Sequence, residues 1–287
     1  MRAFRHFVAI DWSGAKGARQ KGIAIALCTQ GSEAPQLVKP GHRWSRQDVL
    51  DWLLNELPAD SLVGLDLSPA FPFDDAKAYF PEWDRSPANA RMLWRLVDEI
   101  ADKDSHLAST SFVTHPDARR HFRHGKDDCG DLFTGGAGRM RLTETRQRPR
   151  GLAPSSCFNL VGAAQVGKSS LTGMRILNRL NGAIPIWPFD PVPPEGSLIV
   201  EIYTSLAARA AKLPPGRSKM MTAKALDAAL EELGVDRHAP LPKYTDHATD
   251  AILTSAWLRK AAPDPALWNP PGLAKIAQTE GWTFGVT

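Results

Sequence analysis

Three short apolar stretches near the N-terminus constrain the fold of this chain more than any other feature. They cover residues 4–11, 21–29 and 36–44, and polar segments join them. Stretches of eight or nine residues that contain aromatic and β-branched side chains are typical of strands. Because the joining segments are shorter than a crossover helix requires, the three stretches predict an antiparallel meander.

The chain after the meander alternates between helical and extended patterns. Ser45 is a suitable N-cap, and apolar residues from Val49 to Leu57 recur at helical spacing. Residues 61–67 and 197–203 are short apolar runs that predict two further strands, and residues 245–262 predict a closing helix. This order predicts an α/β fold, with an RNase H-like mixed sheet of five strands and flanking helices.

A long segment separates the fourth and fifth predicted strands. Residues 67–197 contain far more chain than one crossover requires. We therefore expect residues 1–287 to form a single domain in which roughly residues 70–182 are an inserted or elaborated lobe. A chain of 287 residues buries enough surface to fold without disulfide bonds or a structural metal ion.

Cysteine usage and hydropathy predict the compartment. Cys28, Cys129 and Cys157 are odd in number and widely spaced, which favours reduced thiols. The longest apolar run, residues 22–28, is too short to cross a bilayer, and residues 1–6 do not lead into the apolar core of a signal peptide. We therefore expect a cytoplasmic protein without a membrane partner.

Four carboxylates occupy positions that this fold would bring together. Asp11, Asp66 and Glu201 each interrupt an apolar strand, and Asp250 lies in the first turns of the closing helix. A buried carboxylate needs a cation, a donor or water, and hard cations such as Mg²⁺ or Mn²⁺ prefer carboxylate oxygens. Two such ions would stabilise the attacking oxygen of water and the leaving oxygen of the phosphodiester during hydrolysis. Each acid alone is explained equally well as a turn former or a solvent-facing residue, so only the set of four favours a catalytic metal site.

Two polar residues accompany these acids. His247 lies three residues before Asp250 and on the same helix face, where it would ligate a metal ion or carry a proton. The alternative is that His247 is simply exposed in the first turn. Ser13 follows Asp11 in a turn, and we expect it to contact the substrate.

These motifs resemble the family called domain of unknown function 429, which is described as predicted nucleases with an RNase H-like fold. The resemblance implies that the family's metal-binding acids correspond to Asp11, Asp66, Glu201 and Asp250. The strand acids and the helical His-x-x-Asp pair are more distantly similar to Holliday-junction resolvases. Residues that carry the family resemblance are 8–14 (Val-Ala-Ile-Asp-Trp-Ser-Gly), 64–69 (Gly-Leu-Asp-Leu-Ser-Pro), 200–203 (Val-Glu-Ile-Tyr), 247–251 (His-Ala-Thr-Asp-Ala), 161–174 and 280–285.

A second motif competes with this interpretation. Residues 162–169 satisfy the P-loop pattern G-x-x-x-x-G-K-S, in which Lys168 and Ser169 would serve phosphate and Mg²⁺. Residues 157–161 would supply the preceding strand. The chain from residue 205 onward is mainly helical, however, whereas a P-loop domain needs further parallel strands. Residues 162–170 could also bind a substrate phosphate without ATPase activity.

Positive charge is concentrated in one segment. The chain has a net charge of +4, and residues 118–150 contain nine Lys and Arg against four Asp and Glu. Arginines next to a glycine-rich turn suit contact with a phosphate backbone, so Arg139 and Arg141 are predicted to bind substrate. The alternative is an ordinary solvated loop.

Together these features predict an enzyme, a nuclease that hydrolyses nucleic-acid phosphodiester bonds with Mg²⁺ or Mn²⁺ and has DNA or RNA as its partner. Two alternatives remain open, namely a non-catalytic nucleic-acid or nucleotide-binding module and a P-loop NTPase. The sequence leaves the choice between DNA, RNA and small nucleotides undecided, and also the oligomeric state.

Overall fold

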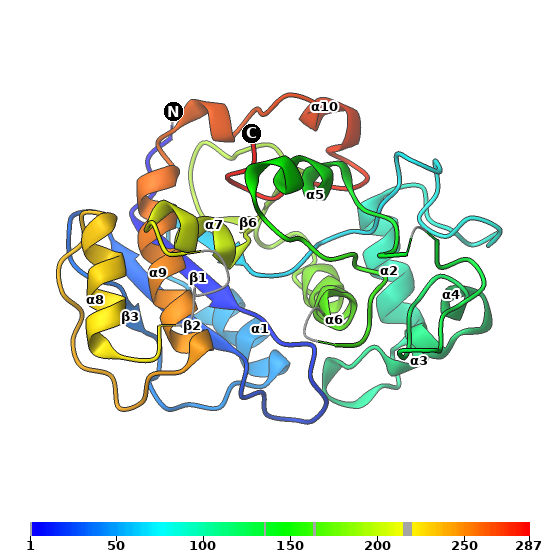
Figure 1. The fold of residues 1–287 in the computed structure, drawn as a ribbon, viewed down its shortest axis with the longest axis horizontal. Helices are drawn as coiled ribbons and strands as arrows, with labels where there is room; N and C mark the ends of the chain where they lie inside the picture. The colour runs from blue at the N-terminus through cyan, green and yellow to red at the C-terminus, as the bar shows by residue number, and fades with distance from the viewer. Residues whose placement is uncertain (1, 135, 163–164, 215–219) are drawn as a thin grey trace.

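The computed structural model describes residues 2–134, 136–162, 165–214 and 220–287 (Figure 1). Within these ranges the chain forms a mixed six-stranded sheet, and its strands lie in the order β3-β2-β1-β4-β6-β5. The antiparallel part consists of β1 (His6–Asp11), β2 (Ala24–Thr29) and β3 (Gln36–Leu37). The parallel part consists of β1 and the strands β4 (Ser61–Leu65), β6 (Leu198–Glu201) and β5 (Ile186–Trp187).

The α/β class and the opening antiparallel meander are confirmed, but two details of the predicted sheet are wrong. The sheet has a sixth strand because Ile186–Trp187 pairs with β6 at the edge, and two residues are too few to produce a periodic pattern. The third strand ends at Leu37 rather than near residue 44. Lys39 has a positive φ of 50° and is followed by Pro40, so the chain turns away from the sheet there.

Alternation along the strands divides the buried side chains between the two faces of the sheet. Val8 and Ile10 pack with α1 (Arg46–Asn55), α2 (Ala90–Ile100) and α6 (Val166–Arg179). Phe7 and Ala9 face the other way. They pack with the second helical layer, which contains α7 (Thr204–Ala210), α8 (Ala223–Glu232), α9 (Asp246–Ala261) and α10 (Leu273–Ile276). Figure 1 shows these two groups of helices on opposite sides of the sheet.

The segment between β4 and β6 contributes to the first of these layers. Buried residues of this segment, Trp94, Phe122 and Leu171, belong to the same apolar cluster as Val8 and Val63 of the sheet. The inserted chain therefore packs on the sheet itself. Its remaining helices are α3 (Thr110–Thr114), α4 (Pro116–Arg119), α5 (Leu142–Gln147) and the 3₁₀ turns η1 (Ser105–Leu107) and η2 (Arg148–Arg150), and a third turn, η3 (Pro265–Leu267), lies near the C-terminus.

Two predicted helices form at the expected places. Ser45 caps α1, because its hydroxyl accepts a hydrogen bond from the backbone N–H of Asp48 (2.9 Å) and the Asp48 carboxylate accepts one from the Ser45 N–H (3.0 Å). Thr245 caps the closing helix α9 in the same way through its hydroxyl. Among the described residues, no helix is long and apolar enough to span a bilayer.

Candidate functional site

Two carboxylates lie at the carboxyl ends of the adjacent parallel strands β1 and β4. Asp11 is the last residue of β1, and Asp66 directly follows β4. Ile10 pairs with Leu65 across the two strands, and the backbone N–H of Asp66 donates a hydrogen bond to the Ile10 carbonyl (3.0 Å). Because side chains alternate along each strand, Asp11 and Asp66 belong to the face that α9 covers.

Helix α9 brings two further groups to this end of the sheet. It packs against β1 and β2, and its first turns carry His247 and Asp250. The Nδ1 atom of His247 lies 3.3 Å from Oδ2 of Asp11. Asp250 is close enough that its charge raises the pKa of both Asp66 and His247. The structure therefore brings Asp11, Asp66, His247 and Asp250 into one neighbourhood.

Among the described residues, this neighbourhood contains more acidic than basic side chains. Burial, followed by the charges of Asp11, Asp250 and Glu201, raises the pKa of Asp66 well above its ordinary value. Burial also raises the pKa of Asp11, although the hydrogen bond with His247 partly opposes this effect. The same hydrogen bond raises the pKa of His247. A cation would therefore be stabilised among these groups more than a further anion.

The donor chemistry fits a hard divalent cation. Asp11, Asp66 and Asp250 offer carboxylate oxygens, which Mg²⁺ and Mn²⁺ prefer. Within the described part of the chain, no group of three or more His, Cys, Asp or Glu side chains is already arranged to hold a metal ion. Carboxylates that repel one another are expected to rotate towards a shared cation once it binds, because the cation removes the repulsion. Ligation would thus require side-chain movement.

Glu201 lies on the opposite face of the sheet, so its surroundings differ from those predicted for a metal ligand. It pairs with Leu65 across β4 and β6, and Leu65 packs with the cluster on the face away from α9. Arg141 donates hydrogen bonds to both carboxylate oxygens of Glu201 (2.6 and 2.8 Å), and the Thr283 hydroxyl donates a third (2.8 Å). Glu201 is therefore the ion-pair partner of Arg141. The alternation of side chains along β6 places its carboxylate on the face away from α9, where Arg141 lies.

The two arginines predicted to bind substrate are also engaged within the protein. Arg141 is 1% exposed and donates to Glu144 as well as to Glu201. Arg139 donates to Asp75 and to three backbone carbonyls in residues 72–79. Neither guanidinium is directed to a free surface, which differs from the predicted role in phosphate contact.

Other cations of the basic segment are paired as well. Arg119 forms an ion pair with Asp128 (2.8 Å), and Arg120 forms ion pairs with Asp131 (2.7 Å) and Glu82 (2.9 Å). Acids within and outside the segment therefore neutralise much of the charge that the sequence concentrates there. By contrast, Arg148 and Arg150 in η2 have exposed side chains.

Ser13 lies beside the histidine of the site. A Cβ atom placed on Gly22 would lie 3.1 Å from Oγ of Ser13 and 3.2 Å from Nε2 of His247. Both side chains therefore border the same small space, into which a larger residue at position 22 would intrude. The predicted contact of Ser13 with a substrate stays a prediction.

Arg46 positions the segment that carries Ser13, and sequence reasoning did not identify it. Its guanidinium is buried and donates to the backbone carbonyls of Ser13 (3.1 Å) and Ala15 (2.6 Å). Burial lowers the pKa of Arg46 to about 10. The available signal was the place of this arginine three residues before Val49, on the apolar face of α1.

The P-loop motif at residues 162–169 lacks its structural context. Residues 163 and 164 lie outside the described residues, and the strand predicted at 157–161 is absent apart from a single bridge between Asn159 and Arg123. A Cβ atom on Gly167 would lie 2.3 Å from the Cys157 carbonyl, so this glycine is explained by close packing. Lys168 lies in the first turn of α6, and its predicted phosphate contact stays a prediction.

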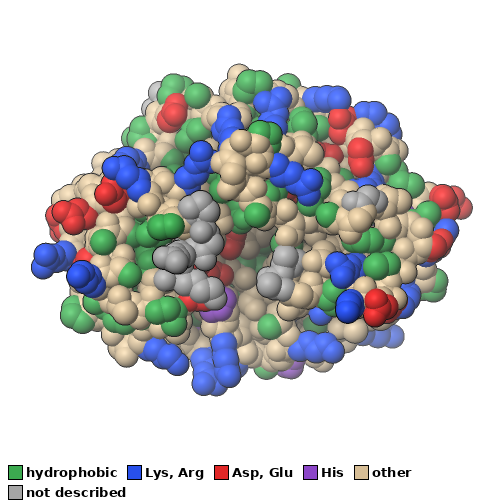
Figure 2. Space-filling view, viewed as in Figure 1, with side chains coloured by type: hydrophobic (Ala, Val, Ile, Leu, Met, Phe, Trp, Pro, Cys, Tyr) green, Lys and Arg blue, Asp and Glu red, His purple; other side chains and the backbone are tan. Residues whose placement is uncertain are grey.

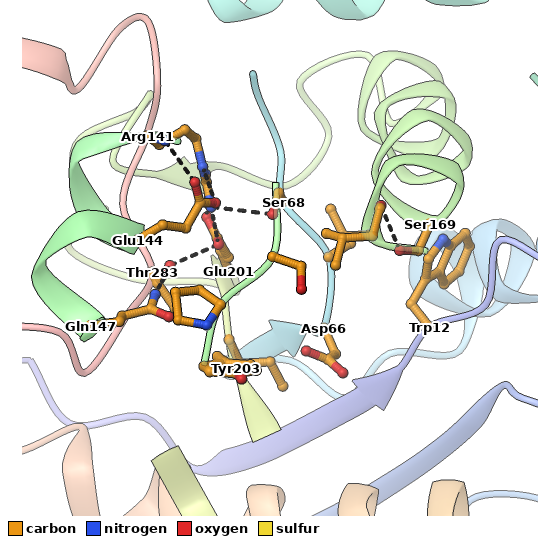
Figure 3. Close-up of a pocket in the computed structure, with 15 residues that line it drawn as sticks. Trp12, Asp66, Ser68, Arg141, Glu144, Gln147, Ser169, Glu201, Tyr203 and Thr283 are labelled. Carbon is orange, nitrogen blue, oxygen red and sulfur yellow. Dashed lines mark hydrogen bonds and ion pairs between the residues drawn. The ribbon is translucent and has the colours of Figure 1, made fainter. Parts of the chain in front are cut away.

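A cavity of about 180 Å³ opens beside Asp66 (Figure 3). On one side lies the hydrogen-bonded group of Arg141, Glu144 and Glu201, and on the other lies Trp12. Figure 3 shows the Asp66 carboxylate apart from the dashed hydrogen bonds of the arginine group. Asp66 is therefore accessible from a space large enough for a small organic group.

The space-filling view shows a hollow in the middle of one face, with acidic side chains inside it and a histidine at its rim (Figure 2). Lysine and arginine side chains are visible above and below this hollow.

Comparison with known proteins identifies no relative, because no family model, no curated protein and no solved structure matches the chain.

Proposed function

We propose that this protein is a nuclease that hydrolyses phosphodiester bonds of nucleic acid with Mg²⁺ or Mn²⁺. The observation that carries the proposal is the convergence of Asp11 and Asp66, from adjacent strand ends, with Asp250 and His247 from the helix packed across them. We further propose an RNase H-like fold. An antiparallel three-stranded opening followed by α1 and the parallel strand β4 supports this assignment.

In this proposal the three aspartates hold the cations. Bound among them, Mg²⁺ or Mn²⁺ would supply Lewis-acid stabilisation of the charge that develops on the phosphoryl oxygens. The strand register fixes the backbone positions of Asp11 and Asp66, and the packing of α9 on β1 fixes that of Asp250. Glu201 takes no part in ligation, since Arg141 and Thr283 already use its oxygens.

His247 has the geometry of a proton carrier. Its Nδ1 faces the Asp11 carboxylate at 3.3 Å, an arrangement that favours the tautomer with the proton on Nδ1. Nε2 is then the basic nitrogen, and it borders the space next to Ser13. The imidazole can therefore accept a proton at Nε2 from an attacking water molecule, or return one to the leaving oxygen.

Cleavage of a panel of DNA and RNA structures by the full chain tests this proposal. We expect Mg²⁺- or Mn²⁺-dependent cleavage that falls at least a hundredfold in Asp11→Asn and Asp250→Asn, because each removes a ligand charge. Asp51→Asn is the matched control, since Asp51 is an exposed aspartate on α1. Equal cleavage by the wild type, Asp11→Asn and Asp250→Asn would refute the proposal.

Thermal unfolding with Mn²⁺ gives an independent readout that does not need a substrate. A ligand at a hundred times its Kd stabilises a native protein by about 2.7 kcal/mol. We expect Mn²⁺ to raise the Tm of the wild type and of Asp51→Asn, and to leave that of Asp11→Asn nearly unchanged. A Tm that is insensitive to Mn²⁺ in every variant would contradict metal binding by these aspartates.

A further inference from the structure

A basic groove reaches the candidate site from the side of β2. Its volume is about 460 Å³, and it lies between β2, residues 37–44 and the start of α9. His247, which is hydrogen-bonded to Asp11, forms part of its wall. Ala24 also lines the groove and is the residue that pairs with Asp11 across β1 and β2. The groove and the carboxylates are therefore direct neighbours.

The charged side chains that line this groove are basic. Of the described residues that line it, none is acidic, whereas four are Lys or Arg and two are His. Lys39 is neutralised by Glu56 (2.7 Å), and His42 lies 3.1 Å from Asp48. The other three cations are exposed and form no ion pair with any described residue. These are Lys21, Arg43 and Lys243.

One polar group in the groove wall favours a polyanion that also carries hydrogen-bond donors. Gln20 is 2% exposed, and its Nε2 donates to the Gly17 carbonyl (2.6 Å), which fixes the orientation of the amide. Its Oε1 has no hydrogen-bond partner among the described residues. A buried acceptor of this kind is satisfied by an N–H or O–H donor. Nucleic acid carries such donors on its bases, and RNA also carries them on its 2′-hydroxyl groups, whereas an ionised inorganic polyphosphate does not.

We propose that this groove binds the backbone of a nucleic-acid strand whose adjacent phosphodiester lies at the aspartates. This inference rests on the proposed function, because it assumes that the aspartates cleave a phosphodiester. The residues that line the groove are different residues from the three aspartates. Lys21, Arg43 and Lys243 contact successive phosphates, and the wall at Gln20 contacts a base or sugar. The segment of residues 118–150 supplies none of these three cations.

The test is equilibrium binding of fluorescent single-stranded DNA and RNA in EDTA, where cleavage cannot occur. The groove variant carries Lys21→Gln, Arg43→Gln and Lys243→Gln together. The matched control carries Lys103→Gln, Lys260→Gln and Arg95→Gln, which are exposed cations outside the groove. Circular dichroism and Tm establish that both triple variants are folded.

We expect the groove variant to bind at least tenfold more weakly at low salt, while the control stays within twofold of the wild type. Each lost phosphate contact should reduce the salt slope of log Kobs by about 0.7 for a single strand, so three contacts give about 2. Equal binding by the groove variant and the control would overturn the proposal, and so would absence of binding by the wild type. Competition by polyphosphate equal to that by nucleic acid would refute the choice of ligand.

A small substrate separates this proposal from the proposed function. Bis(p-nitrophenyl) phosphate has a single phosphate, so it has no further phosphate for the groove cations when its phosphodiester lies at the aspartates. The groove variant should therefore hydrolyse it at the wild-type rate. For a long strand the same variant should show a raised KM with a nearly unchanged kcat. If Asp11→Asn abolishes hydrolysis while the groove substitutions change neither KM nor binding, the function stands and the groove proposal fails.

Discussion

Replacing Arg141 with methionine removes the cation from a cluster of buried carboxylates. Arg141 is 1% exposed and lies 2.8 Å from Glu144 and 2.6 Å from Glu201, whose side chains are 4% and 5% exposed. Removing one partner of a buried ion pair costs about 3–5 kcal/mol, because the other charge stays buried without compensation. Two carboxylates lose their partner here. We therefore expect the free energy of unfolding of Arg141→Met to fall by about 5 kcal/mol at pH 8.

The pH dependence of this loss identifies its cause. Burial already raises the pKa of Glu144, and the positive charge of Arg141 opposes that effect. Without Arg141, the folded-state pKa of Glu144 should lie further above that of the unfolded chain. A carboxylate of this kind destabilises the fold when it is ionised, and protonation removes the penalty as pH falls through the folded pKa. The difference between Arg141→Met and the wild type should therefore narrow from pH 8 to pH 5.

Urea unfolding followed by tryptophan fluorescence measures this difference directly. Arg120→Met is the matched control, since Arg120 also pairs with two carboxylates but does so at the surface, and exposed ion pairs contribute little. Adding Glu144→Gln and Glu201→Gln to Arg141→Met should recover part of the lost stability. A loss below about 1 kcal/mol, or one that stays constant between pH 8 and pH 5, would refute the reasoning.

Three further predictions concern other parts of the fold. Gly64→Ala should lower the free energy of unfolding by about 1–3 kcal/mol in urea titrations, because its Cβ would lie 2.6 Å from Cγ2 of Ile202; wild-type stability would contradict this. Gly14→Ala should lower both Tm and cleavage, because its Cβ would lie 2.3 Å from the backbone nitrogen of Ser169, and an unchanged Tm would refute that contact. Burial lowers the pKa of His121 in the folded protein to about 4. As the pH falls, the histidine of the unfolded chain is therefore protonated before that of the folded chain. The free energy of unfolding should fall by up to about 3 kcal/mol from pH 6.5 to pH 4. His121→Phe should remove this part of the pH dependence in urea titrations, and an unchanged profile would contradict it.

The sequence predicted those elements whose signals are local. The apolar runs of β1, β2 and β4 and the caps Ser45 and Thr245 depend on neighbouring residues, so pattern and composition were sufficient. The sixth strand could not be predicted because Ile186–Trp187 is stabilised by its partner β6, and no periodicity marks it. The early end of β3 did have a local signal in Pro40 and Gly41.

The sequence of β6 alone does not show on which face of the sheet Glu201 lies. All four residues of β6, Leu198–Glu201, are buried, so the apolar run has no solvent-facing side from which to count. Only the register with β4, in which Glu201 pairs with Leu65, assigns the two faces. Asp11 and Asp66 follow the opposite alternation, and their carboxylates lie with α9. A carboxylate in an apolar strand therefore predicts a buried partner, and the register decides which partner that is.

Which basic residues remain available to a ligand also depends on the tertiary structure. Residues 118–150 have the highest density of basic residues, yet Arg139 and Arg141 are paired with acids far away in the chain, Asp75 and Glu201. The groove cations that form no ion pair with a described residue come from three separate segments, each with an ordinary composition. A local excess of arginine attracts acids during folding, because an unpaired buried guanidinium is costly. Cations that remain available to a polyanion are instead those that the fold leaves exposed beside surfaces without acids, and the described residues that line the groove have this arrangement.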